Sequence, residues 1–450
     1  MEELLRLTAE RAIEYQRTLN KRSVAPTPEA ISRLKEFDAP LQDEPVEADE
    51  IIRMLDEIGS PATVTSTGGR YFGLVIGGSL PAAQASSWLA DTWDQNAGLN
   101  VTSPISVALE EVVLRWLLAV LGLPKDCGAS FTTGTTMANL AGLAAARHVL
   151  LKKEGWDVES QGLFGAPEVT VVVGAEAHTT LFRALAFLGL GKDRVVTVPV
   201  DSQGRMRSDS LPNVFGPTII CIQAGNVNTG AFDPAEEICE AAHRAGAWVH
   251  VDGAFGLWAA ASPERAHLTK GFANADSWST DAHKWLNVPY DSGIGFVRDA
   301  EYLRAAMTLR AAYLPLDHKR EPLDYTPESS RRARGIAIWA ALRSLGRNGL
   351  ADLVERTCRH AARFAEGLTA GGYKILNDVV INQVLVSFGD AERTRKVIAD
   401  IQADGTCWCG GTVWQGQTAM RISVSSWATT EHDVEGSLAA ILRIAKRSTI

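Results

Sequence analysis

The sequence predicts an α/β protein with a mostly parallel central sheet, an N-terminal helical arm and a smaller C-terminal α+β domain. Three observations support this class. Apolar strand-like runs alternate with helical segments between about residues 63 and 299. The residues before that region show helical patterns, and those after about residue 322 combine long helical patterns with short strands. Strands that alternate with helices are typical of parallel sheets.

Residues 1–60 should form the helical arm. Helical patterns cover residues 4–19 and 50–58, and the stretch between them, residues 26–46, is rich in proline and acidic side chains. An arm of this size has too little apolar surface to fold alone.

Residues 61–321 should form the large domain. His178 follows the first of its clearest strand-like runs, and Asp252 closes the last one. Open α/β sheets bind ligands beyond the carboxyl ends of their strands, so both side chains should face one crevice. The runs cover residues 169–173, 194–200, 217–222 and 247–251, with a helical segment at residues 234–244.

Residues 322–450 should form the smaller domain. Its helical patterns cover residues 331–345, 350–370, 391–403 and 431–447, and its short strands cover residues 382–387 and 418–423. Long helices around a few strands indicate an α+β domain.

Composition excludes several classes of protein. The 450 residues are 46% hydrophobic and 22% charged, as in a soluble globular chain, and no apolar run approaches the roughly 18 residues of a membrane span. The net charge of −9 is spread along the chain without a basic block, so nucleic acid is not an expected partner. The N-terminus lacks the apolar core of a signal peptide, and we expect a cytoplasmic protein.

The six cysteines are scattered, and we expect reduced thiols. Only Cys407 and Cys409 lie close together, and no clustered histidine or cysteine pair supplies the two further ligands of a metal site. We therefore expect no metal.

Lys284 and Asp252 carry the strongest chemical signal. Lys284 lies 32 positions after Asp252, in the segment Asp281-Ala282-His283-Lys284-Trp285. Pyridoxal phosphate needs a lysine amine that holds it as a Schiff base and a carboxylate that keeps its ring nitrogen protonated. Either residue alone would more often be a surface lysine or a turn aspartate. Their combined context favours the cofactor.

A phosphate site is indicated by Thr133-Gly134-Thr135-Thr136, which stands just before the helical pattern of residues 137–152. Backbone N–H groups at a helix N-terminus attract phosphate, Gly134 permits close approach, and the hydroxyls add hydrogen bonds. The alternative is an ordinary threonine cap at the start of the helix.

Six segments in order make the chain resemble the group II pyridoxal-phosphate-dependent amino acid decarboxylases. A seventh, weaker likeness begins at Arg421. The resemblance implies a type I aminotransferase-like fold, pyridoxal 5'-phosphate as cofactor, an L-amino acid as substrate, and a homodimer in which the arm packs against the partner subunit. The six segments are residues 69–73, 103–110, 133–140, 250–254, 282–285 and 330–339.

The resemblance also implies roles for individual residues. His178 would stack on the cofactor ring, and His283 would contact the phosphate. The candidate catalytic residues are Lys284, Tyr313, His178 and Asp252. The candidate cofactor-binding residues are Thr135, Thr136, His178, Asn226, Asp252, Ala254, His283 and Lys284.

The chain departs from that family in two places. Asp281-Ala282 replaces the Asn-Pro that many members have before His-Lys-Trp, so the phosphate contact of that asparagine does not carry over. Residues 224–230 replace a Gly-Thr-Thr segment, which leaves Asn226 as the candidate for the 3-oxygen side of the ring.

Tyr313 distinguishes the possible reactions. The resemblance implies that a loop tyrosine at this position returns a proton to the carbon that has lost carbon dioxide, which gives an amine. An aminotransferase, a carbon–carbon lyase or an aldehyde synthase would use the same lysine and aspartate. A non-catalytic protein that binds the cofactor for structure or regulation is the alternative outside enzymes.

Three aromatic residues bear on the substrate. Tyr71, Phe72 and Trp93 lie near segments that line the side-chain pocket in the resembling family, and they favour an aromatic or apolar substrate side chain. Arg70 favours an acidic substrate instead.

Overall fold

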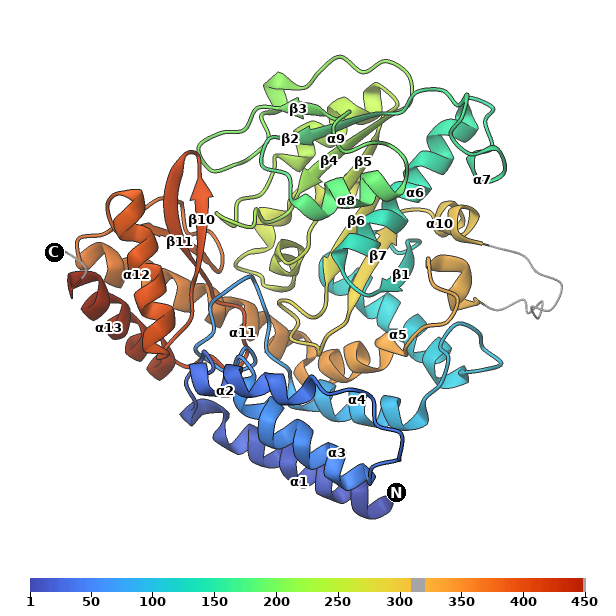
Figure 1. Cartoon of the computed structure of the whole chain (residues 1–450). Helices are drawn as coiled ribbons and strands as arrows, with labels where there is room; N and C mark the ends of the chain where they lie inside the picture. Colours follow the sequence, from blue (N-terminus) through green and yellow to red (C-terminus); the bar gives the residue numbers. More distant parts are fainter. Residues whose placement is uncertain (309–319, 448–450) are drawn as a thin grey trace.

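A mostly parallel sheet of seven strands forms the centre of the molecule, as the sequence predicts (Figure 1). The computed structural model describes residues 1–308 and 320–447. The strand order is β1-β7-β6-β5-β4-β2-β3, and only β7 runs antiparallel to its neighbours. The strands are β1 (Gly128–Thr132), β2 (Thr170–Gly174), β3 (Val196–Val198), β4 (Thr218–Gln223), β5 (Trp248–Asp252), β6 (Ser277–Asp281) and β7 (Gly293–Val297).

Helices cover both faces of this sheet, which explains why its central strands are apolar on both sides. Alternate residues of β2 show the division, because Val172 faces one core and Val171 and Val173 face the other. The first face is covered by α4 (Pro81–Trp93), α5 (Pro104–Leu121), α9 (Ala235–Arg244) and the first part of α11 (Arg334–Ala370). The other is covered by α6 (Thr135–Lys153), α8 (Thr179–Phe187) and α10 (Ala300–Met307), with the short α7 (Val158–Gln161) after α6.

A second, antiparallel sheet of four strands forms a smaller layer with its own core. Its order is β10-β11-β9-β8. The strands are β8 (Lys374–Ile375), β9 (Gln383–Ser387), β10 (Gly410–Trp414) and β11 (Gln417–Ser423), and the helices α12 (Ala391–Asp404), α13 (Glu431–Arg447) and the second part of α11 pack on them.

The helix α11 joins the two layers. The sequence predicts separate helices at residues 331–345 and 350–370, and the structure agrees, because α11 consists of two helices that meet at a kink at Gly346. Gly346 has φ 61°, a left-handed conformation that favours glycine. The break therefore redirects the helix from the large sheet to the small one.

The N-terminal helices lie along the lower edge of the molecule beside α4 (Figure 1). They are α1 (Glu2–Thr18), α2 (Pro28–Arg33) and α3 (Ala48–Met54), and a further helical turn, Leu55–Gly59, follows α3. Within the described residues, no helix is long and apolar enough to cross a membrane.

Candidate active site

The predicted site residues converge because neighbouring strands end at the same edge of the sheet. Asp252 is the last residue of β5 and pairs with Ser279 of β6, two residues before the end of that strand. His178 follows β2 and precedes α8, and Lys284 follows β6 by three residues. The crevice expected from the sequence is therefore built from β2, β5, β6 and the start of α6.

The Lys284 amine lies against a buried carboxylate. Its Nζ is 3.2 Å from Oδ2 of Asp281, whereas the Lys284 side chain is 21% exposed. The backbone of Lys284 packs directly against Gly77, because a Cβ at residue 77 would lie only 1.8 Å from the Lys284 carbonyl oxygen. The lysine is thus fixed at its backbone, and its amine can reach a ligand.

The N-terminus of α6 carries a polar group without a partner. Among the described residues, the Thr135 hydroxyl is buried and makes no hydrogen bond, although the Thr135 N–H donates to Asp281 Oδ1 at 2.7 Å. Gly134 lies in a narrow space, since a Cβ there would be 3.3 Å from the His283 ring. Thr136, the next residue, is partly exposed. A helix N-terminus with a free hydroxyl suits an anionic group.

His283 is held in one orientation. Its Nδ1 accepts a hydrogen bond from the Ser292 N–H at 3.1 Å, and its ring stacks on Tyr290 with centroids 4.3 Å apart. Burial lowers the pKa of His283, and the neighbouring Asp281 opposes that shift. In the neutral ring Nε2 carries the proton, and it lies 3.6 Å from Asp281 Oδ1.

Asp252 is a buried carboxylate with no cationic partner among the described residues. It is 5% exposed and accepts hydrogen bonds from the Ala254 N–H at 3.2 Å and the Asn139 amide at 3.4 Å. A buried anion is costly unless a positive charge or several donors compensate for it. Its surroundings therefore suit a ligand that brings a positive charge.

His178 lies among the charged groups of the crevice. Its Nδ1 accepts a hydrogen bond from the Thr180 N–H at 3.3 Å, which caps α8. Burial lowers the pKa of the His178 imidazole. Asp252 raises this pKa, and Lys284 and Arg421 lower it. His178 is thus mostly neutral near pH 7.

Arg421 of β11 is a site residue that the sequence analysis noted only as part of the seventh likeness. It has no carboxylate partner among the described residues, and its Nη1 donates to the Val227 carbonyl at 3.1 Å. Burial raises the pKa of Tyr71, and Arg421 lowers it, so the guanidinium lies close to both Tyr71 and His178. The signal in the sequence is an arginine within a strand that carries no other charged residue.

Several residues weighed for the substrate pocket have other roles. Phe72 is fully buried in the small core, where it packs edge-on against Phe364 at 5.0 Å. Arg70 donates hydrogen bonds to the carbonyls of Asn20, Arg22 and Thr406, so it holds the N-terminal arm against the rest of the protein. Its guanidinium is therefore engaged by the protein and is not available to an acidic substrate. Trp93 is 46% exposed at the end of α4. Tyr71 alone stays beside the crevice, stacked on Trp408 at 5.1 Å.

Two further residues of the sequence analysis need separate mention. The Asn226 oxygen accepts hydrogen bonds from the N–H groups of Asn228 and Thr229, so its amide stabilises its own loop. Tyr313 lies outside the described residues.

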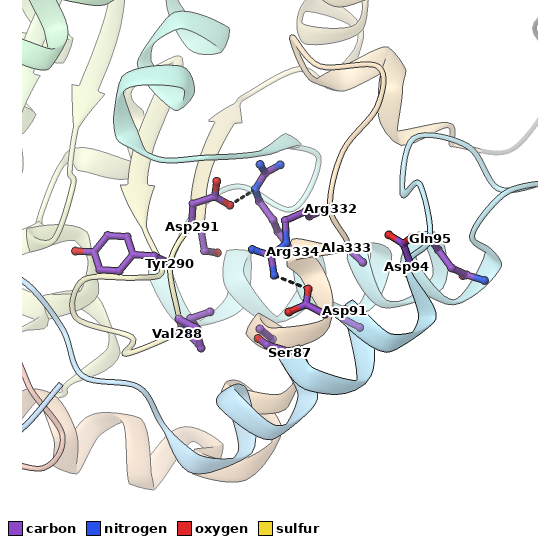
Figure 2. Close-up of a pocket in the computed structure, with 14 residues that line it drawn as sticks. Ser87, Asp91, Asp94, Gln95, Val288, Tyr290, Asp291, Arg332, Ala333 and Arg334 are labelled. Carbon is purple, nitrogen blue, oxygen red and sulfur yellow. Dashed lines mark hydrogen bonds and ion pairs between the residues drawn. The ribbon is translucent and has the colours of Figure 1, made fainter. Parts of the chain in front are cut away.

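A cavity of about 300 Å³ lies beside the site, between α4, residues 288–292 and the start of α11 (Figure 2). Arg334 is buried there and pairs with Asp291 at 2.9 Å, whereas Arg332 pairs with Asp91 at 2.7 Å (Figure 2). Of the two neighbouring arginines, Arg334 therefore lies inside the protein, whereas Arg332 lies at its surface.

The arrangement suits one kind of ligand. The buried Asp252 favours a cationic ring atom, the start of α6 favours an anionic tail, and the Lys284 amine can bond a carbonyl carbon. Within the described ranges no three histidine, cysteine, aspartate or glutamate side chains cluster as metal ligands would. These residues fit pyridoxal phosphate, a pyridinium with an aldehyde and a phosphate.

Comparisons with known proteins agree with this fit. The family model described as "Pyridoxal-dependent decarboxylase conserved domain" matches residues 28–389. An L-2,4-diaminobutyrate decarboxylase of Rhizobium meliloti is 29% identical over 385 residues, which are 80% of this chain and 73% of that protein. An acidic amino acid decarboxylase of Mus musculus is 26% identical over 371 residues, 79% of this chain. That match spans 66% of the mouse protein, slightly less than two thirds of its length.

Solved structures share the fold. The structure of Oryza sativa TDC with PLP and tryptamine superposes with a TM-score of 0.91 at 21% identity and covers 99% of this chain and 97% of that one. At 21% identity this likeness shows the shared fold alone. That fold is the one that the sequence resemblance implies.

Proposed function

The chain belongs to the pyridoxal-dependent decarboxylase family, and from this premise we propose that it decarboxylates an L-amino acid to the amine with pyridoxal phosphate bound at Lys284. The observation that carries the proposal is the buried Asp252 carboxylate, which has no cationic partner among the described residues and lies at the strand edge that also presents Lys284. When bound, the cofactor draws away the electron pair left by the broken bond.

We assign the cofactor-holding roles from the placement of the residues. Lys284 bonds the aldehyde carbon, and Asp252 meets the ring nitrogen. Thr135, Thr136 and the α6 N-terminus meet the phosphate, where the unpartnered Thr135 hydroxyl offers a donor. His178 offers its neutral ring face for stacking, His283 borders the phosphate, and Ala254 and Asn226 border the ring.

Arg421 is proposed to bind the substrate carboxylate. Lys284, the other cation near the crevice, pairs with Asp281 and is assigned to the cofactor. Arg421 has no carboxylate partner among the described residues and no assigned contact with the cofactor. An arginine fork matches a carboxylate in geometry and charge. A held carboxylate fixes which bond at the α-carbon is aligned for cleavage, and that choice decides between decarboxylation and the other reactions of the cofactor.

Tyr313 is proposed to return the proton that completes the amine. His178 is the next candidate within the described residues, because its ring lies among the charged groups of the same crevice. The stacked rings of Tyr71 and Trp408 beside Arg421 support a substrate with an aromatic or apolar side chain.

A homodimer is proposed because the N-terminal helices leave apolar side chains uncovered. No residue of α1 is buried, although the helix includes Leu5, 52% exposed, and Ile13, 45% exposed. Trp88 and Leu89 of the adjacent α4 are 46% and 55% exposed. Apolar surface on this scale marks an interaction site. We also propose a cytosolic location, where scattered thiols remain reduced.

The proposal is tested by a substrate screen with a matched variant. Protein loaded with pyridoxal phosphate is offered each standard amino acid and L-2,4-diaminobutyrate, and carbon dioxide and amine are measured. Borohydride reduction followed by peptide mapping should label Lys284, and Lys284→Ala should lose the label and all turnover. Label on another lysine, or keto acid as product in place of amine and carbon dioxide, contradicts the proposal.

A further inference from the structure

We propose that His250 and Asn139 are positioning residues that hold the Asp252 carboxylate toward the ring nitrogen of the cofactor. The inference rests on the proposed function and extends it to two residues that do not touch the cofactor. It is carried by a hydrogen-bonded layer between α6 and the large sheet.

The layer is polar where an apolar contact would be expected. His250 on β5 and Ser277 and Ser279 on β6 point to the same face of the sheet as Asp252, and Asn139 of α6 covers them. The histidine, the two serines and the asparagine are each 0% exposed. The helix approaches closely, since a Cβ at Gly142 would lie 2.9 Å from the His250 ring. Buried polar groups are unfavourable unless every one is paired, and these are.

A continuous chain of hydrogen bonds runs through this layer to Asp252. The Trp248 indole N–H donates to Ser277 Oγ at 2.8 Å, and Ser277 Oγ lies 2.8 Å from His250 Nδ1. His250 Nε2 lies 2.9 Å from Asn139 Oδ1. The Asn139 amide nitrogen then donates to Asp252 Oδ2 at 3.4 Å.

The chemistry of the groups fixes every proton in the chain. Asn139 Oδ1 only accepts, so His250 Nε2 must carry the hydrogen. Burial lowers the pKa of His250 to about 3, which keeps the ring neutral and leaves Nδ1 to accept from the Ser277 hydroxyl. The Ser279 hydroxyl also donates to Asn139 Oδ1. The amide therefore cannot turn over without losing two donors.

The consequence for Asp252 is a fixed donor on one oxygen. If Asn139 turned, its oxygen would face the carboxylate, and the two acceptors would repel each other. With the amide fixed, Oδ2 is held by Asn139 and Oδ1 by the Ala254 N–H. The carboxylate then stays aimed at the crevice, where a protonated ring nitrogen would meet it.

The test compares two cofactors that differ only at that nitrogen. Cofactor-free protein is titrated with pyridoxal phosphate and with its analogue in which a C–H replaces the ring nitrogen, and tryptophan fluorescence reports both affinities. The preference is the ratio of the affinity for pyridoxal phosphate to the affinity for the analogue. The Asp252→Asn variant shows how much of this preference remains without the carboxylate. His250→Leu should lower the parent preference for pyridoxal phosphate roughly tenfold, as expected for one hydrogen bond to a charged group.

His250→Gln provides the matched control, because its amide N–H can replace the Nε2 donor and should keep the parent preference. Asn139→Ala repeats the test with a small change in an alanine-rich helix if His250→Leu does not fold. A folded His250→Leu or Asn139→Ala variant that weakens both cofactors equally, or neither, overturns the inference. A parent that binds neither cofactor at Lys284 overturns the proposed function instead.

Discussion

The Thr135 backbone N–H donates to the Asp281 carboxylate at 2.7 Å, which places a negative charge at the N-terminus of α6. The second oxygen of Asp281 lies 3.2 Å from the Lys284 amine. One side chain thus contacts both the proposed phosphate site and the lysine that should bond the cofactor. A phosphate that arrives at α6 meets a carboxylate, and like charges at close range repel.

Asp281→Asn should therefore bind pyridoxal phosphate more tightly than the parent. The amide keeps an oxygen that can accept from Thr135, removes the repelling charge and adds a donor. We expect roughly a tenfold gain in affinity, equivalent to about 1.4 kcal/mol, in a fluorescence titration of cofactor-free protein.

Pyridoxal, which lacks the phosphate, is the control for this variant. If repulsion of the phosphate is the cause, Asp281→Asn gains much less affinity for pyridoxal than for pyridoxal phosphate. Equal gains for both would assign the effect to the Lys284 amine, which the substitution also releases from its ion pair.

Asp252→Asn should keep the cofactor but lose most of the turnover, because a neutral amide does not stabilise a positive charge on the ring nitrogen. A fall in kcat on the order of 100-fold is expected of a lost electrostatic contact to the reacting system. Carbon dioxide release at saturating substrate measures it. Asp404→Asn, which removes a carboxylate paired with Arg443, should turn over like the parent. Near-parent turnover of Asp252→Asn removes this residue from the mechanism.

The homodimer prediction is tested by the introduction of a charged side chain on the exposed apolar face of α4. The parent should sediment at twice the 48.5 kDa mass of the chain, and Leu89→Glu should shift it toward the monomer with loss of activity. Phe164→Glu is the control, since Phe164 is 98% exposed beyond α7 and lies far from α4 in sequence. An active parent monomer at assay concentration contradicts the proposal.

Periodicity predicted the fold well where strands are apolar and separated by helices. The runs at residues 217–222 and 247–251 became β4 and β5 within one residue at each end, because parallel strands covered on both faces leave long apolar signals. The interruption at Gly346 falls between the two helical patterns predicted at residues 331–345 and 350–370, but the direction of the bend could not be predicted, since it depends on packing. Strand pairing, including the antiparallel β7, depends on contacts distant in sequence.

The site was predictable to the extent that chemistry follows strand ends. Asp252 and His178 could be placed in one crevice because each follows or ends a strand-like run, and Lys284 could be added because the cofactor requires a lysine amine together with such a carboxylate. Arg421 could not, because it comes from the other sheet, and only folding brings β11 to the crevice. Arg70 and Phe72 were misjudged for a related reason, since nearness to a motif in sequence does not decide which way a side chain points.

Tyr313→Phe should separate carbon dioxide release from amine formation. The phenylalanine keeps the size of the side chain and removes the hydroxyl that we propose as the proton donor. The variant should still release carbon dioxide, yet form little amine, consume oxygen, and give aldehyde, ammonia and hydrogen peroxide. An oxygen electrode and amine analysis check this. If Tyr313→Phe makes amine at the parent rate, the proton comes from His178 or Lys284.

The buried His250 should make the protein sensitive to acid. Its pKa is about 3 in the folded protein because of burial, and near 6.5 when unfolded, so only the unfolded chain takes up the proton between these values. The free energy of unfolding should therefore fall by about 1.4 kcal/mol for each pH unit below 6.5 on account of this residue. His250→Gln removes that contribution and, between pH 7.5 and 5, should lose about 2 kcal/mol less than the parent in urea unfolding. His432→Gln, at an exposed position, should follow the parent. Parallel curves for parent and His250→Gln would mean that His250 accepts a proton in the folded protein, and then the neutral ring could not hold Asn139 toward Asp252.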